Sequence, residues 1–209
     1  MRRDDDRRDA GMTLVELLTA MIVFGIAMTM IMTAVMLVMR SRDEVLQSAN
    51  AVAEVREALQ TIDRQVRSGN VLFNPGAETI PSTCTGNATT RTGTCMRVYT
   101  QADGVPRCYQ WQVVDNGPGE SYLRSRSWLP GGASTEWTTV ATDLTLTGAP
   151  FKLEGADTAY DERLVRVAIY ARDARTGRDV KIDSALTGRN TTYGFDAGQC
   201  TPVPAPVGG

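Results

Sequence analysis

The sequence contains no histidine. Because histidine is the commonest general base near neutral pH and a frequent metal ligand, its absence removes the usual routes to acid–base and zinc chemistry. There is also no Gly-rich phosphate loop, no G-x-S-x-G nucleophile elbow and no repeated Asp pattern for calcium. We therefore expect no catalytic, cofactor-binding or metal site, and we predict that the chain is not an enzyme. One polar loop has acidic residues in or beside it that could bind a cation: Glu154, Asp157, Asp161 and Glu162. We favour a solvated loop instead.

An excess of basic charge is missing as well. The 22 Lys and Arg residues against 24 Asp and Glu residues leave a net charge of −2, which is not the balance of a dedicated nucleic-acid-binding protein. A local exception is the segment 122–128, in which alternation places two aromatic and two arginine side chains on one face of a strand: Tyr122, Arg124, Arg126 and Trp128. Such a face can stack bases and contact phosphates. We favour a solvated face or a subunit contact and keep these four residues as candidate ligand contacts.

What the sequence does have is one long apolar run, residues 11–39, GMTLVELLTAMIVFGIAMTMIMTAVMLVM. A helix needs about 20 such residues to cross the bilayer core, so the run predicts one transmembrane helix. Its single charge is Glu16. An unpaired carboxylate within a span costs roughly 2–3 kcal/mol or more, which makes Glu16 a candidate functional residue.

The residues before this run, MRRDDDRRDA, have balanced charges and no hydrophobic face. A secretory signal peptide would have a shorter apolar core followed by a small-residue cleavage site, and neither feature is present. The change in composition lies in front of the run, at Gly11 and Met12. This order of charged leader, glycine and Met-Thr-Leu-Val-Glu-Leu-Leu resembles the signature of the type IV prepilin family.

The resemblance implies that a prepilin peptidase removes a leader, residues 1–11, by cutting between Gly11 and Met12, and then methylates the new N-terminus at Met12. Phenylalanine is more usual than methionine at that position, although the family accepts both. Glu16 falls where the family keeps a glutamate. The leader would lie in the cytoplasm, the span in the inner membrane, and the rest of the chain outside the cytoplasm.

The position of Glu16 also has a physical interpretation. Cleavage gives Met12 a free ammonium group near the membrane, and the carboxylate of one staggered helix can meet the ammonium of another. In a low dielectric this pairing offsets much of the cost of burying either charge alone. We therefore assign Glu16 to assembly with other pilin or pseudopilin subunits. The alternative is that Glu16 reaches the lipid headgroups as an ordinary flanking residue.

The helical pattern continues beyond the span. In residues 40–68, apolar residues recur every three or four positions between charged ones, and Ser68-Gly69-Asn70 is a stop signal. We predict one helix with a transmembrane half (12–39) and an amphipathic half (40–68) that packs on the chain's own β-structure, with a coiled-coil partner as the alternative. The predicted stripe consists of Val45, Leu46, Ala49, Val52, Val55, Leu59, Ile62 and Val66.

From residue 69 onward, short strand-like runs alternate with Gly, Pro, Asn and Asp clusters. They predict a β-rich head domain over 69–200 and a Pro/Gly-rich flexible tail over 201–209. The pattern predicts an α+β fold with the long helix packed on one antiparallel sheet, and this order of elements resembles the pilin-like fold. The expected strands are 71–73, 96–100, 109–114, 122–128, 136–140, 143–146, 151–153, 164–171 and 180–186.

The four cysteines all follow the span and include no C-x-x-C pair. An even number in a domain that we place outside the cytoplasm indicates two disulfides in an oxidising compartment. Of the three possible pairings we favour Cys84–Cys95, which would close a Thr/Gly/Asn-rich loop, and Cys108–Cys200, which would fasten the tail to the sheet. Four buried free thiols are the alternative.

Together these features predict a minor pilin or pseudopilin that is cleaved, N-methylated and assembled into a type IV pilus or a secretion pseudopilus. The length, the Trp- and Tyr-bearing strands and the late Arg189-Asn190 dipeptide look most like J-type minor pseudopilins of type II secretion and W-type minor pilins. The alternative is an uncleaved, membrane-anchored extracellular binding protein with a role in DNA uptake.

Overall fold

The computed structural model describes residues 13–102, 104–155, 163–173, 176–189, 195 and 197–205. These fall into two compact units, Met1–Asp43 and Glu44–Gly209, which are described in turn. Gly11, Met12 and Asn190 lie outside the described residues, as do the acidic residues Asp157, Asp161 and Glu162.

One helix, α1 (Leu14–Ser68), contributes to both units. At its start the Thr13 hydroxyl accepts a hydrogen bond from the Glu16 N–H at 3.3 Å, which is half of a Thr-x-x-Glu capping box. The acidic side chain of Glu16 also lies in the first turn, where the helix dipole favours negative charge. At the other end the chain passes directly from Ser68 into β1 at Gly69, as the stop signal predicted.

In the first unit, every described residue is exposed. The segment has a mean hydropathy of 2.4 over an 18-residue window, none of which is buried. Apolar side chains point outward on all sides, including Phe24, Met30 and Leu37. A helix that is apolar all round requires an apolar surrounding, so this part of α1 meets the requirement of a membrane span by length and composition.

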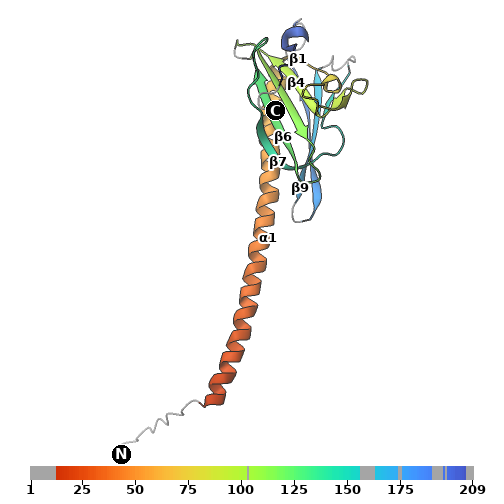
Figure 1. The fold of residues 1–209 in the computed structure, drawn as a ribbon. Coiled ribbons are helices and arrows are strands. Elements are labelled where there is room, and N and C mark those ends of the chain that lie inside the picture. The colour runs from red at the N-terminus through yellow and green to blue at the C-terminus, as the bar shows by residue number, and fades with distance from the viewer. Residues whose placement is uncertain are drawn as a thin grey trace, which may run out of the picture. The chain divides into compact units, whose positions relative to one another are not determined.

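The second unit is built on an antiparallel sheet that gathers around the C-terminal part of α1 (Figure 1). Its order is β1-β4-β5-β6-β7-β9-β8-β3-β2, and β10 pairs with the free side of β9. The strands among the described residues are β1 (Gly69–Leu72), β2 (Gly86–Asn87), β3 (Thr92–Gly93), β4 (Cys95–Thr100), β5 (Arg107–Val114), β6 (Ser121–Trp128), β7 (Thr138–Thr145), β8 (Phe151–Leu153), β9 (Leu164–Asp173) and β10 (Arg178–Thr187). Two short 3₁₀ helices complete the unit, η1 (Pro75–Ala77) and η2 (Ala197–Cys200).

Strand β9 holds the two halves of the sheet together. Along one side it pairs with β8 through residues 165–167 and with β7 through residues 170–171. Along the other side it pairs with β10 over ten residue pairs. The alternation of Val165, Val167 and Ile169 with exposed or half-buried residues follows the predicted pattern, because each strand residue faces opposite to its neighbours.

The main core lies between α1 and one face of this sheet. The helix contributes six buried residues, Ala51, Val55, Ala58, Leu59, Ile62 and Val66, and the strands contribute large side chains such as Trp111, Leu123 and Phe151. This α+β arrangement confirms the predicted fold class. The predicted stripe is wrong at its start, because Val45, Leu46 and Ala49 are exposed; helix burial in the core begins only at Ala51.

Two stretches of the sheet differ from prediction. The segments 136–140 and 143–146 form one strand, β7, which continues through Asp143 despite its positive φ of 55°. Asp tolerates this left-handed conformation better than most residues, and the register between β6 and β7 shifts before and after Leu123. The polar loop 85–94 also contains the two-residue strands β2 and β3, which extend the sheet beyond β8.

Replacing Ile62 tests whether this helix–sheet contact supports the second unit. Ile62 is fully buried in the core, so we expect Ile62→Ala to lower the free energy of unfolding by about 2–5 kcal/mol. The measurement is chemical denaturation of the purified chain in detergent micelles. Leu46→Ala, on the same helix at a position 49% exposed, should change it by less than about 0.5 kcal/mol. Equal losses in the two variants would contradict this account of the core.

Candidate assembly helix and covered sheet face

The first candidate site is the N-terminal end of α1. Glu16 is exposed; its N–H donates to the Thr13 hydroxyl and its carbonyl accepts from the Thr19 hydroxyl at 3.0 Å. A shallow hollow on this face of the helix is lined by Glu16, Thr19, Ala20, Val23, Phe24 and Ala27. Small residues let another helix backbone approach closely. The hollow therefore places the carboxylate beside a surface suited to helix packing.

The four cysteines form two disulfides, Cys84–Cys95 and Cys108–Cys200, with sequence separations of 11 and 92. These are the pairs that the sequence favoured, and they leave no free cysteine in the described chain. The first closes the loop between η1 and β4. The second joins η2 to β5. Both disulfides lie on the side of the sheet that faces away from α1.

This side of β4, β5 and β6, which we call the covered face, is made of three rows of residues that lie directly opposite one another across the strands. Side chains of alternating residues point to the same face, and the intervening Met96, Val98 and Trp111 belong to the main core on the other face. The rows are Cys95–Gln112–Arg124, Arg97–Gln110–Arg126 and Tyr99–Cys108–Trp128.

Two segments distant in the sequence pack over the covered face. Tyr99, Cys108, Trp128 and Cys200 form a second buried cluster, and Val203 packs against it. Val203 falls within the segment that the sequence analysis assigned to a flexible tail. The loop from Phe73 to Cys84 lies over the middle row. The covered face is thus an interior layer of the unit, which strand alternation alone does not reveal.

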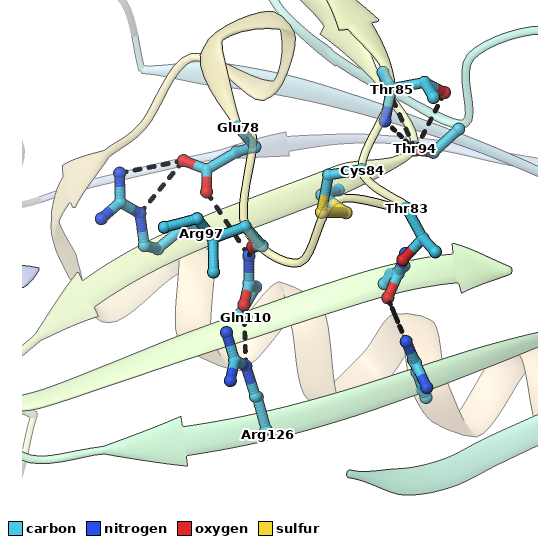
Figure 2. The surroundings of a disulfide bond; sticks show 12 residues. Glu78, Thr83, Cys84, Thr85, Thr94, Arg97, Gln110 and Arg126 are labelled. Carbon is cyan, nitrogen blue, oxygen red and sulfur yellow. Dashed lines mark hydrogen bonds and ion pairs between the residues drawn. A yellow bond between two sulfur atoms is a disulfide. The ribbon is translucent and has the colours of Figure 1, made fainter. Parts of the chain in front are cut away.

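Glu78, from this loop, is the acidic centre of the layer. It is only 4% exposed and pairs with Arg97 at 3.0 Å. The Gln110 amide donates to the second Glu78 carboxylate oxygen at 3.4 Å and to the Ile80 carbonyl at 2.6 Å, and its own oxygen accepts from Arg126 Nε at 2.8 Å. Figure 2 shows this chain of contacts running from the loop across the strands. Arg97 also donates to the Cys200 carbonyl at 2.7 Å, so one polar network joins both covering segments.

The candidate ligand contacts share one face of β6, as predicted, but that face is not an open surface. Arg126 and Trp128 are each 2% exposed, while Tyr122 and Arg124 are half-buried. The Arg124 guanidinium donates twice to the Gln112 side-chain oxygen, at 3.0 and 2.7 Å. The favoured interpretation of a solvated face is therefore wrong for Arg126 and Trp128, because the covering segments exclude solvent from them.

Burial shifts the titration of the charged groups in this layer. It raises the pKa of the Glu78 carboxyl above its usual range, against the opposing effects of Arg97 and Arg126. It lowers the pKa of Arg126 to about 10, and the neighbouring positive charge of Arg124 acts in the same direction. The layer therefore holds its charges at a cost in desolvation.

On the opposite side of the sheet, a groove of about 550 Å³ runs between α1 and strands β5 to β7. Its walls include Glu57 and Gln65 from the helix and hydroxyl groups from the strands. The Trp111 indole N–H donates to the Gln65 side chain at 2.7 Å across the inner end of this groove.

Sequence reasoning missed Glu78, Arg97, Gln110 and Gln112. The two glutamines had a detectable signal, because they alternate with apolar residues along β5 and so mark a polar face. Glu78 had none: it lies in an irregular loop whose sequence does not indicate that it folds over a sheet. Among the acidic residues of the predicted polar loop, Glu154 is described and pairs with Lys152 at 3.0 Å and Arg166 at 2.6 Å.

The buried carboxyl of Glu78 predicts a particular pH dependence. Its pKa is raised above the ordinary 4.5, so its contribution to stability is fully present below pH 4.5 and is lost as the pH rises through the raised value. Relative to Glu78→Gln, the free energy of unfolding of the wild-type chain should fall as the pH rises above about 4.5. The measurement is chemical denaturation of both proteins across pH 3–8.

Glu154→Gln is the matched control because the pKa of Glu154 is shifted in the opposite direction to that of Glu78. Hydrogen bonds from Lys152 and Arg166 lower the pKa of Glu154 below 4.5, so its contribution is lost as the pH falls through the lowered value. If the free energy of unfolding of the wild type increased relative to that of Glu78→Gln as the pH rose above 4.5, the described burial of Glu78 would be contradicted.

The two disulfides should differ in their contribution to stability. In the chain-entropy description a cross-link stabilises more when it closes a longer loop. With separations of 92 and 11 residues, the Cys108→Ala/Cys200→Ala variant should lose about 2 kcal/mol more than Cys84→Ala/Cys95→Ala. Denaturation of the non-reduced variants measures the difference. An equal or larger loss from removing Cys84–Cys95 would show that the loop cover, and not chain closure, dominates.

Comparison with known proteins identifies the N-terminal segment. A family model described as prokaryotic N-terminal methylation motif matches residues 6–32, a range that contains Gly11, Met12 and Glu16. No curated protein and no solved structure gives a significant match to the chain. The motif implies processing by a prepilin peptidase and assembly with other pilins, and with the apolar helix it indicates membrane anchoring. The motif, α1 and the antiparallel sheet together support a type IV pilin-like protein, and the family that carries this motif is structural.

Proposed function

We propose that this chain is a minor pilin or pseudopilin of a type IV pilus or a type II secretion-like pseudopilus. It is inserted with its N-terminus in the cytoplasm, cleaved after Gly11, methylated at Met12 and assembled through the apolar part of α1. The observation that carries the proposal is the match of the methylation motif to residues 6–32, a range that extends into the part of α1 that is exposed and apolar on all sides.

Glu16 is the residue that we assign to assembly. It is the single charge in the apolar run, and an unpaired carboxylate there is costly. Leader cleavage creates an amino group at Met12, four residues before Glu16. Pairing the carboxylate of one subunit with the amino group of the next offsets the cost for both groups. The adjacent small residues, Thr19, Ala20 and Ala27, allow the helices to approach closely enough for this contact.

The second unit supports a role outside the cytoplasm. Its two disulfides are typical of oxidising compartments. Its length and cross-linked head favour a minor subunit, of the J-type pseudopilin or W-type minor pilin kind. A buried polar layer held by two covering segments gives a rigid head that can sit at the tip or in the initiation complex of a filament.

Processing is tested by producing the chain with and without a prepilin peptidase and determining its N-terminus by mass spectrometry. The proposal predicts a mature chain beginning with N-methylated Met12 when the peptidase is present. The Gly11→Leu variant, which alters only the cleavage position, should keep its leader. An intact leader on the wild-type chain in the presence of active peptidase would favour the uncleaved, membrane-anchored binding protein instead.

Assembly is tested separately with Glu16→Gln, which keeps the size of the side chain and removes its charge. We expect cleavage to proceed as in the wild type and incorporation into filaments with partner subunits to fall by roughly tenfold or more. Quantitative immunoblotting of sheared filaments gives the incorporation. Glu57→Gln, at an exposed position on the same helix, should assemble normally. Normal assembly of Glu16→Gln would remove Glu16 from this role.

A further inference from the structure

Three buried N–H donors near the edge of the covered face have no acceptor among the described residues. They are Nη2 of Arg126 and the indole Nε1 atoms of Trp128 and Trp137. Buried polar groups are nearly always hydrogen-bonded, and leaving one unpaired costs about 1–3 kcal/mol, more when it is charged. Three unpaired donors of the same kind therefore call for a common explanation.

The two tryptophan donors belong to rings that lie against the guanidinium of Arg126, which carries the third donor. Arg126 Cζ is 4.7 Å from the centre of the Trp137 ring and 5.3 Å from that of Trp128. The Arg124 guanidinium packs on the same Trp137 ring, at 4.4 Å. Arg126 uses Nε for Gln110 and Nη1 for the Ser134 hydroxyl at 3.3 Å. Its Nη2 has no acceptor in the part of the chain that the structure describes.

The charges of this layer are also unbalanced. Glu78 is its buried carboxylate, and Glu78 is paired with Arg97. Among the described residues, the hydrogen-bond acceptors of Arg124 and Arg126 are neutral oxygens, from Gln112, Gln110 and Ser134. The other acidic residue of the neighbouring segment, Glu136, is exposed. Aromatic faces attract a cation but accept no strong hydrogen bond, so stacking on tryptophan leaves both the Nη2 group and the excess positive charge uncompensated.

We propose that the cluster of Arg124, Arg126, Trp128 and Trp137 binds an oxyanion, a carboxylate or a sulfate- or phosphate-like group. A guanidinium and indole N–H groups are donors only, so they select acceptors and reject cations. An oxyanion supplies both the missing acceptors and the missing negative charge, and its hydrogen bonds with a buried guanidinium are of the strong, charge-assisted kind. The half-buried Trp137 and Arg124 form the exposed side of the cluster.

The source of the oxyanion is either a free small anion or a carboxylate carried by another polypeptide, and three probes distinguish them. Sodium sulfate and sodium acetate represent free anions, and the blocked peptide acetyl-Gly-Asp-Gly-amide represents a carboxylate on a chain. Each is titrated into the full-length protein in detergent micelles at constant ionic strength, with sodium chloride making up the balance. Two of the three tryptophans lie in the cluster, so intrinsic fluorescence reports binding, and the shift in Tm gives an independent readout.

We expect saturable fluorescence changes and a raised Tm with at least one probe. Trp137→Phe keeps an aromatic ring but removes the indole N–H donor, so the apparent Kd should rise about tenfold or more. Arg126→Gln should abolish binding, and Trp137→Phe keeps the test valid if Arg126→Gln does not fold. Arg166→Gln, which removes an arginine from a surface ion pair, should bind like the wild type.

Binding of sulfate or acetate but not the peptide assigns a free anion, and binding of the peptide assigns a carboxylate on a partner chain; either result supports the site. No saturable response to any probe would overturn the proposal. An equal apparent Kd in the wild type and in Trp137→Phe would overturn it as well, because the anion would then bind elsewhere.

Discussion

A single helix must satisfy two different surroundings, and most of the structure follows from that constraint. Over residues 14–39, α1 is apolar on every side and exposed, so it is stable only where its surroundings are apolar too. From Ala51 to Val66 it is apolar along one stripe, which packs against the sheet. The change between the two patterns coincides with the division of the chain into two units. Within the apolar part, the one costly group is Glu16.

The head is organised on both faces of strands β4 to β6. One face packs on α1 as an ordinary apolar core. The other carries a polar layer in which Glu78 and Arg97 pair, glutamines bridge the strands, and two disulfides hold the covering segments in place. Arg97 joins both covering segments, because it pairs with Glu78 and donates to the Cys200 carbonyl, so this layer helps to fix where the loop and the C-terminal segment lie.

The sequence predicted those features that arise from local pattern. Unbroken helical periodicity up to Ser68-Gly69 located the end of α1, and alternation in residues 164–171 located β9. The cysteine pairing followed from the polar sequence between Cys84 and Cys95, which predicted no other anchor, although β3 within that loop pairs with β8. What the sequence could not show depends on contacts between distant segments. Alternation places Arg126 and Trp128 on one face, but only the packing of residues 73–84 and 197–203 decides that this face is buried. The burial of Glu78 and the unpaired tryptophan donors also depend on contacts between distant segments, so the sequence could not show them.

The central claim is that the Glu16 carboxylate of one subunit meets the N-terminal nitrogen of Met12 on a neighbouring subunit. The most direct measurement is zero-length carbodiimide cross-linking of assembled filaments that mix isotopically light and heavy chains, followed by mass spectrometry of the linked peptides. The account predicts an amide bond between Glu16 and the Met12 nitrogen that joins light to heavy chains. Filaments that contain the processed chain but yield no such mixed cross-link, while other carboxylate–amine pairs react, would contradict it.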